Sequence, residues 1–363
     1  MMSAVLPDGD SVQCVAQTAD QSCEISANSV FWLASLTKAI TSVAAMQLVE
    51  SGQLTLDEPV ARLLPVLASP KILHGYDENG KARLSDAETP ITLRHLLTHT
   101  SGLAYPFSNS LIGRYAEEEG LPATISGDPR AYLLPLLSEP GTQWHYGVST
   151  DWVGQLIEAA TGESLETVFK TRIFAPLGMA SSSFFLSEEQ KSRLMPVYKR
   201  LPDKSFKQIP FQVPQNPEMY AAGAGLYSTP GDYLRFLNML LHKGQLDGQR
   251  ILSEGSVQAM SSKLLEGPKV GCIDSCNAAL TNDYDPFPGV DKAWGLGFSI
   301  NKTITPQGRK PGSFGWAGLS NIYYWVDPAS RITGLFMTQI LPFADQGALA
   351  SSGECERILY DSI

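Results

Sequence analysis

A helical pattern begins at Ser35-Leu36-Thr37-Lys38-Ala39-Ile40-Thr41-Ser42-Val43-Ala44 and continues to Glu50. Its apolar positions recur at steps of three and four residues, which is the period of one face of an α-helix. Gly52 can end the helix, because glycine readily takes the left-handed conformation just beyond a helix C-terminus. The pattern therefore predicts a helix from Ser35 to Glu50 with Ser35 at its N-terminus.

Strand patterns lie at both ends of the chain. Near the N-terminus, the turn Pro7-Asp8-Gly9-Asp10 separates two short apolar stretches, which predicts a β-hairpin over residues 2–24. β-branched and aromatic residues predict further strands near the C-terminus, over 296–300, 321–326 and 332–337. Helical patterns lie between the two ends, over 92–97, 152–160 and 230–242.

Strands from both termini predict one sheet with a helical lobe inserted between its halves. We place the α/β sheet lobe in residues 1–58 and 285–363, and the mainly helical lobe in residues 59–284. The functional site is then expected at the seam between the two lobes.

The composition is that of a globular protein with a large core. Of the 363 residues, 43% are hydrophobic and 18% are charged, which excludes a disordered chain. The 37 acidic and 27 basic residues give a net charge of −10, which opposes nucleic-acid binding. No apolar run approaches the ~20 residues of a membrane-spanning helix, and the first residues lack the basic and apolar regions of a signal peptide. We therefore expect a soluble cytoplasmic protein without a nucleic-acid or membrane partner.

The sequence gives no signal for a metal or a cofactor. Cys272 and Cys276 have no histidine nearby that would complete a zinc site. His95 and His99 are four residues apart, but Leu96 stands where a zinc protease carries its glutamate, so we expect packed, hydrogen-bonded histidines. Free thiols are expected for the five scattered cysteines, which are Cys14, Cys23, Cys272, Cys276 and Cys355.

Ser35 and Lys38 are candidate reactive residues because they stand three positions apart at a helix start. Residues at this spacing share one face of a helix, so the hydroxyl and the amine can meet. Burial and the positive end of the helix dipole both disfavour an ammonium there, so Lys38 can accept the Ser35 proton. A second copy, Ser299-Ile300-Asn301-Lys302, lies in a strand pattern, where residues three apart point to opposite faces. Taken alone, these two residues are better explained as a helix-capping serine and a surface lysine.

Several further blocks occur in one order along nearly the whole chain. Together with Ser35-Leu36-Thr37-Lys38, the chain resembles the serine β-lactamase/penicillin-binding-protein superfamily, in its class C-type branch with the family VIII carboxylesterases and the lovastatin-pathway acyltransferase. The resemblance implies an α+β fold, a β-lactamase/transpeptidase-like antiparallel sheet flanked by helices, with an inserted mostly helical lobe. The blocks that carry it are 93–103, Pro140-Gly141-Thr142-Gln143-Trp144-His145-Tyr146-Gly147, 223–232, Gly315-Trp316-Ala317-Gly318-Leu319 and Trp325-Val326-Asp327-Pro328.

The resemblance implies roles for individual residues. Ser35 carries the acyl group, and Lys38 and Tyr146 share the general-base role. A Tyr next to a Lys ammonium can relay a proton to the leaving group, which agrees with that role. An aromatic residue packed in a loop is the simpler alternative for Tyr146.

Two segments compete for the family's Lys-Thr-Gly strand. Lys310-Pro311-Gly312-Ser313 looks more like the lactamases, and Trp316-Ala317-Gly318 more like the esterases. Pro311 removes a backbone donor that such a strand must present, so Trp316-Ala317-Gly318 is preferred. The N–H of Leu319 then joins the N–H of Ser35 as the oxyanion pair, and Lys310 is expected in an exposed loop.

This chain departs from the family pattern in two residues that affect substrate choice and in the length of the segment before Ser35. Val148 replaces the asparagine of the lactamase Tyr-x-Asn, and Trp316 replaces the cationic lysine. Both changes suit neutral acyl groups better than a β-lactam carboxylate. Only 34 residues precede Ser35, where family members usually have a helix and a first strand, so a sheet edge is expected to be exposed.

We therefore expect an acyl-serine esterase or transesterase that cleaves small-molecule esters or thioesters and passes the acyl group to water or an alcohol. A role in secondary metabolism fits the resemblance, and an acyl carrier is one candidate donor. No cofactor and no metal are expected. The alternatives are a β-lactamase or D-amino-acid peptidase, and a non-catalytic scaffold that keeps the fold.

Overall fold

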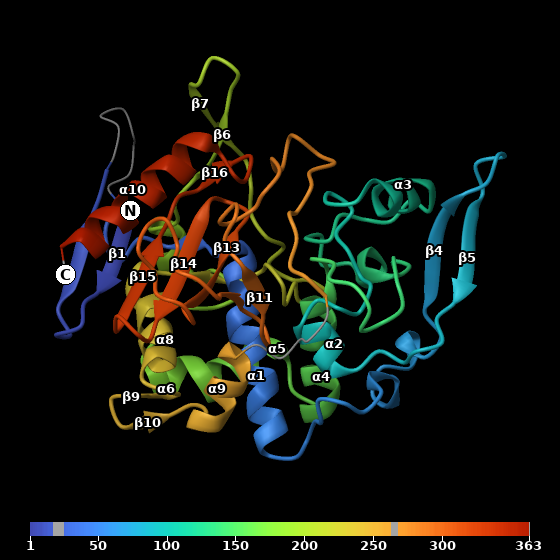
Figure 1. The fold of residues 1–363 in the computed structure, drawn as a ribbon, viewed down its shortest axis with the longest axis horizontal. Helices are drawn as coiled ribbons and strands as arrows, with labels where there is room; N and C mark the ends of the chain where they lie inside the picture. Colours follow the sequence, from blue (N-terminus) through green and yellow to red (C-terminus); the bar gives the residue numbers. More distant parts are fainter. Residues whose placement is uncertain (17–24, 263–267, 363) are drawn as a thin grey trace.

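The computed structural model describes residues 1–16, 25–262 and 268–362. Its largest sheet has seven antiparallel strands in the order β11-β12-β13-β14-β15-β1-β2, so both chain ends build it, as predicted (Figure 1). The predicted hairpin is confirmed by β1 and β2, while residues 17–24 lie outside the described residues. The bounds of the sheet strands are β1 Met2–Val5, β2 Ser11–Cys14, β11 Lys292–Trp294, β12 Ser299–Asn301, β13 Phe314–Gly318, β14 Ile322–Asp327 and β15 Ile332–Phe336.

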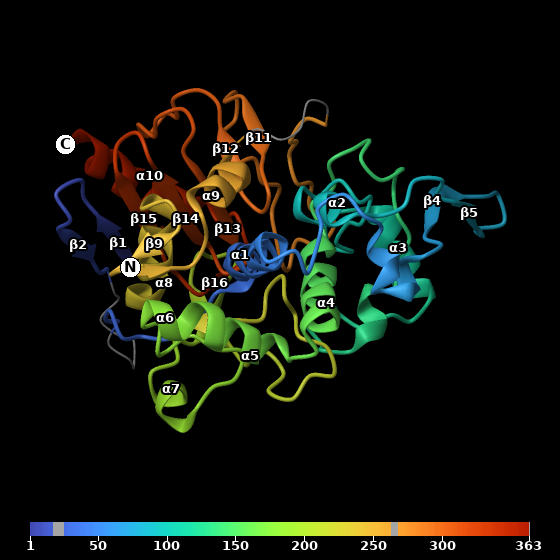
Figure 2. The ribbon, with the colours of Figure 1, turned by 90° about the horizontal axis from the view of Figure 1, so that it is seen from below.

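Helices cover both faces of this sheet (Figures 1 and 2). On one face lie α1 (Thr37–Glu50) and α8 (Pro230–Leu241), and α10 (Gln346–Asp361) crosses the other. Strand β2 forms one edge, and its four residues are exposed. No helix in the described ranges is both long and apolar enough to cross a bilayer.

The predicted helix at Ser35 begins slightly later and is more deeply buried than its period suggested. A 3₁₀ turn, Ala34–Leu36, precedes α1, and Gly52 follows α1 with φ +74°. Most side chains of α1 are buried, polar ones included, because the sheet packs on one side and α4 and α5 on the other. A helix that is buried on all sides in this way belongs to the interior of the protein.

The rest of the described chain forms short helices and small sheets. Its helices are α2 Leu93–Leu97, α3 Ser110–Glu118, α4 Ser149–Thr161, α5 Leu165–Phe169, α6 Ala175–Leu177 and α7 Glu188–Ser192. The small sheets pair β3 (Phe31–Trp32) with β8 (Tyr227–Ser228), β4 (Lys71–Tyr76) with β5 (Ala82–Asp86), and β9 (Gln245–Leu246) with β10 (Gln249–Arg250), and they join β6 (Val197–Arg200), β7 (Phe206–Ile209) and β16 (Ile340–Leu341).

Helices α8 and α9 (Glu254–Ser261) correct the predicted lobe boundary at residue 285. Both fall inside the predicted inserted lobe, yet α8 packs on β1, β14 and β15, and α9 is drawn on the same side of the sheet as α8 (Figure 1). Sequence separation misled the prediction, because the chain returns to the sheet well before its last strands begin. The remaining division between the lobes stays a prediction.

Candidate active site

Ser35 lies in the 3₁₀ turn where the chain enters α1. The preceding Ala34 has φ +46°, an unfavourable value for a residue with a side chain, and this bend leaves Ser35 half-buried rather than enclosed. Lys38 lies one turn later and is only 2% exposed, with its Nζ donating to Ser35 Oγ at 3.2 Å. The structure therefore brings together the serine and lysine that the spacing predicted.

Two further groups bind the Lys38 amine. From the sequence, Tyr105 has no predicted role, and Gly223 appears only as the first residue of the block 223–232. Lys38 Nζ donates to Tyr105 Oη at 2.9 Å and to the carbonyl oxygen of Gly223 at 2.8 Å. A neutral amine has two N–H groups and one lone pair. As an ammonium, Lys38 donates to Ser35, Tyr105 and Gly223. As a neutral amine that keeps its N–H groups on Tyr105 and Gly223, it has its lone pair left for the Ser35 hydroxyl.

Gly223 is held against α1 by its neighbours in the segment 222–226. Thr41 Oγ1 donates to the carbonyl oxygen of Ala222 at 2.7 Å, and Thr37 Oγ1 accepts the N–H of Leu226 at 3.1 Å. Both threonines lie on the buried side of α1, so the helix that presents Lys38 also positions the carbonyl group that Lys38 binds.

Asp151 is a buried carboxylate next to this group of residues. It stands in the first turn of α4, is 2% exposed, and accepts the N–H of Gly223 at 2.9 Å. Burial raises the pKa of Asp151 to about 6, and the charge of Lys38 opposes that increase. An acidic residue in a first helical turn usually signals a favourable helix dipole at the surface, so only its flanking apolar residues hinted at burial.

Tyr146 joins the site from the loop before α4. Its hydroxyl oxygen accepts a hydrogen bond from Trp316 Nε1 at 2.9 Å, and its ring centroid lies 5.0 Å from Lys38 Nζ. Behind it, His99 packs against the ring and accepts the N–H of Gly147 at 3.4 Å. Among the described residues, Tyr105 and not Tyr146 makes the direct hydrogen bond to Lys38.

The preferred strand segment, Trp316-Ala317-Gly318, runs along the turn that carries Ser35. It forms the end of β13, and a carbon added at Gly318 would lie 2.7 Å from the carbonyl oxygen of Leu33. In the described part of the chain, the N–H groups of Ser35 and Leu319 have no hydrogen-bond acceptor. Two unpaired donors beside a nucleophile are what an oxyanion requires.

The site opens into a cavity of about 260 Å³, and Ser35, Tyr105, Tyr146 and Trp316 are among the residues that line it. No Lys or Arg is among its described lining residues, so the cavity suits a neutral, apolar group. Most of the remaining lining is aromatic or aliphatic and consists of Trp32, Phe107, Ile125, Ile209, Phe211, Ile273, Leu280, Leu319, Leu341 and Phe343.

Other sequence-based expectations have mixed outcomes. Lys310 is exposed in a loop, and His95 and His99 are packed and hydrogen-bonded, all as predicted. Val148 is fully buried at the N-cap of α4 and does not line the cavity, so it cannot contact a substrate there directly. The thiols of Cys14, Cys272, Cys276 and Cys355 are free as expected, and Cys23 lies outside the described residues.

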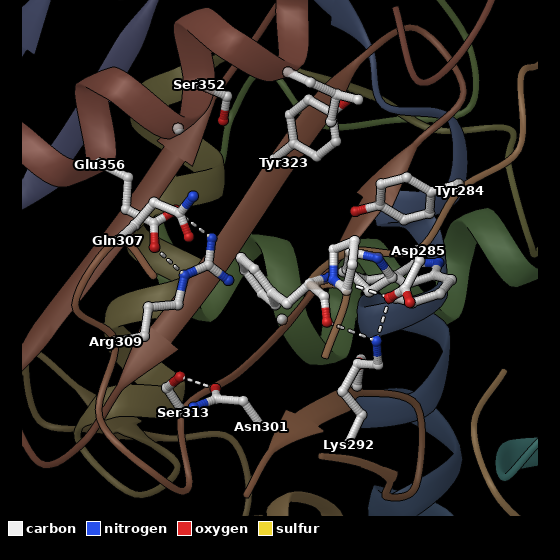
Figure 3. A pocket seen from close by; sticks show the side chains of 18 of the residues that line it. Tyr284, Asp285, Lys292, Asn301, Gln307, Arg309, Ser313, Tyr323, Ser352 and Glu356 are labelled. Carbon is white, nitrogen blue, oxygen red and sulfur yellow. Dashed lines mark hydrogen bonds and ion pairs between the residues drawn. The ribbon is translucent and has the colours of Figure 1, made fainter. Parts of the chain in front are cut away.

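A second cavity, of about 510 Å³, lies between the sheet and α10 and shares Trp316 with the first (Figure 3). Four of its charged groups form two ion pairs. Arg309 donates two hydrogen bonds to Glu356, both at 2.6 Å, and Lys292 binds Asp285 (Figure 3). These pairs fasten α10 and the loop before β11 to the sheet that carries Trp316.

Comparisons with known proteins agree with this geometry. A family model described as Beta-lactamase matches residues 1–351. The chain is 33% identical over 326 residues to the Aspergillus terreus monacolin J acid methylbutanoyltransferase, covering 86% of this chain and 77% of that protein. It is 30% identical over 333 residues to the Penicillium rubens lovastatin esterase, covering 86% of this chain and 80% of the relative.

A solved mutant structure of simvastatin synthase from Aspergillus terreus superposes with a TM-score of 0.85 at 29% identity, covering 99% of this chain and 92% of the other. The fold class implied by the sequence resemblance, a β-lactamase/transpeptidase-like antiparallel sheet with flanking helices, is confirmed. From the family match and the shared identity we conclude that this chain belongs to the beta-lactamase family.

Proposed function

We propose that the chain is an acyl-serine enzyme that removes an acyl group from a neutral small-molecule ester or thioester and transfers it to an alcohol or to water. The observation that carries this proposal is the 3.2 Å contact between Ser35 Oγ and the buried Lys38 Nζ at the edge of an apolar cavity. Relatives named as an acyltransferase and an esterase support it.

Acylation begins when Ser35 Oγ attacks the substrate carbonyl carbon and its proton passes to Lys38 Nζ. The O–H bond breaks, an N–H bond forms, and the carbonyl π electrons move to the oxygen. The N–H groups of Ser35 and Leu319 stabilise that oxyanion, with Gly318 allowing the strand to approach closely. Collapse of the intermediate expels the alkoxide or thiolate and leaves the acyl group on Ser35.

We assign to Tyr146 the protonation of the leaving group. Its oxygen already accepts a hydrogen bond from Trp316, so the hydroxyl proton of Tyr146 remains free to be donated. Lys38, now an ammonium, can return a proton through the same group, so the two residues share the acid and base steps. Deacylation repeats the sequence with an alcohol or water as the nucleophile.

The donor class covers esters and thioesters, because both present a carbonyl carbon and a leaving group that Tyr146 can protonate. We include acyl groups held on a carrier protein among the donors. Comparing turnover of a free acyl thioester with that of the same thioester on a carrier tests this part of the proposal.

Intact-mass spectrometry after incubation with p-nitrophenyl acetate tests the function. We expect one acetyl adduct on the unaltered protein and none on the Ser35→Ala variant. Ser299→Ala is the matched control, since Ser299 begins the second Ser-x-x-Lys sequence but lies in β12, and it should keep the adduct. An unmodified wild-type protein, or an adduct on Ser35→Ala, would refute the proposal.

The site is poorly suited to the hydrolysis of β-lactams. The described cavity lining has no Lys or Arg to bind a β-lactam carboxylate. We therefore expect nitrocefin to be turned over far more slowly than simple esters, and equal rates would contradict the assignment of a neutral substrate.

A further inference from the structure

Asp151 is a buried ionisable group that the acyl-transfer steps described above do not use. Its side chain extends from the first turn of α4 to the floor of the active-site cavity, where only 2% of the residue is exposed. Placing a carboxylate there is costly unless a charge or several hydrogen bonds offset its lost hydration. Such a group close to a reactive site calls for a chemical explanation.

Asp151 and Lys38 face each other across Gly223. Asp151 accepts the N–H of Gly223 at 2.9 Å, while Lys38 donates to its carbonyl oxygen at 2.8 Å. A carbon added at Gly223 would lie 2.7 Å from Asp151 Oδ2 and 3.0 Å from Lys38 Nζ. The space of a single carbon atom therefore separates the two charged groups.

The other titratable groups around this pair are neutral. Burial and the charge of Lys38 hold the pKa of His99 well below its usual value, so its ring is uncharged. Burial raises the pKa of Tyr105 far above the usual range, so it remains a neutral hydroxyl. Tyr132, which packs on Asp151 from the turn 129–132, is neutral for the same reason, because burial raises its pKa as well. Tyr146 faces Lys38 through its ring.

We propose that Asp151 is a positioning residue whose carboxylate is the counter-charge of Lys38, stabilising the ammonium that forms when Lys38 takes the Ser35 proton. The inference rests on the proposed function. It adds a third member to the Ser35 and Lys38 pair, one that does not touch the reacting atoms. By fixing Gly223, Asp151 also orients the carbonyl that aims the Lys38 lone pair at Ser35.

The charge of Asp151 fits this role at neutral pH. Above about pH 6, the value to which burial raises its pKa, the carboxylate is ionised. Proton transfer from Ser35 creates an ammonium beside an existing anion, so the charge that Lys38 gains is compensated in the transition state. A purely structural carboxylate would contribute only the hydrogen bond to Gly223, which an amide oxygen provides equally well.

The Asp151→Asn variant separates the two roles, because its amide oxygen can still accept the Gly223 N–H. Without the carboxylate, no counter-charge stabilises the ammonium that forms on Lys38. We expect kcat/KM of the wild type for p-nitrophenyl acetate to rise as Asp151 ionises near pH 6, and Asp151→Asn to lose that rise. The plateau should fall about tenfold or more.

Glu158→Gln is the matched control. Glu158 lies on the same helix, is half-buried, and accepts the N–H of Leu165 away from the site, so both its profile and its plateau should stay as in the wild type. Loss of folding does not explain the expected result. A carboxyl whose pKa is raised to about 6 stabilises the fold when protonated and loses that contribution as the pH rises through 6. Thermal unfolding at pH 7.5 should therefore show Asp151→Asn at least as stable as the wild type.

Chemical rescue provides a second measurement. In Asp151→Ala, formate can enter the vacated floor of the cavity and restore the charge, whereas formamide has a similar shape without it. We expect formate and not formamide to increase the acylation rate. An Asp151→Asn profile that keeps the rise near pH 6, or equal rescue by both additives, would overturn the inference. A wild-type protein that forms no Ser35 adduct would instead refute the function itself.

Discussion

Gly223 is the position where the smallest change should disturb the site most. An alanine methyl group there would lie 2.7 Å from Asp151 Oδ2, 3.0 Å from Lys38 Nζ and 3.1 Å from Tyr105 Oη. Favourable contacts of a carbon atom begin near about 3.5 Å, so each of these three polar groups must retreat by roughly 0.4–0.8 Å. The φ angle of Gly223 is not in the left-handed region, so the effect is steric and not a matter of backbone conformation.

Two consequences of Gly223→Ala follow from these distances. Overpacking a buried site costs about 1–3 kcal/mol of unfolding free energy. Displacing Lys38 from Ser35 by a large fraction of 1 Å should lower the acylation rate about 100-fold, because proton transfer depends on close alignment. Denaturant unfolding gives the first quantity, and the rate of Ser35 acetylation followed by mass spectrometry gives the second.

Gly231→Ala is the control for this experiment. Gly231 lies in the first turn of α8, and the nearest atom to an added carbon is the carbonyl oxygen of Ala27 at 3.9 Å. We expect wild-type acylation and an unfolding free energy that is unchanged or higher by up to about 1 kcal/mol, since alanine favours a helix. Wild-type stability and acylation in Gly223→Ala would show that Lys38 and Asp151 do not enclose Gly223 as described.

Two further substitutions test contacts that hold the site and the neighbouring sheet in place. Trp316→Phe keeps an aromatic ring but removes the donor to Tyr146, so kcat/KM should fall by up to about tenfold, the value of one hydrogen bond; steady-state kinetics that match the wild type would contradict the role given to Tyr146. Glu356→Gln leaves the guanidinium of Arg309, with 11% of its side chain exposed, without a charged partner. It should lower the unfolding free energy by about 3–5 kcal/mol in denaturant titrations without altering activity per folded molecule. Glu354→Gln, in an exposed pair on the same helix, should change stability by less than about 1 kcal/mol.

Local sequence patterns predicted the parts of this protein that depend on neighbours along the chain. The period of Ser35 to Glu50 placed Ser35 and Lys38 on one face, because helix geometry brings residues three apart together wherever a helix forms. The turn Pro7-Asp8-Gly9-Asp10 and the β-branched segments near the C-terminus predicted strands that the sheet contains. Tyr146 and Trp316 came from the family resemblance, and the structure places both in the cavity.

The surroundings of Lys38 could not be predicted in the same way. Tyr105 and Gly223 are 67 and 185 residues away along the chain, and each reaches the amine only because its segment packs on α1. Asp151 matched the pattern of an exposed first-turn acid and is buried because Tyr132 and the segment 222–226 pack against it. The sequence alone determined which residues share a helix face or a strand, since those relations are set by backbone geometry. Tertiary structure decided which distant groups surround the amine and how little water reaches them, since both depend on how all the segments pack together.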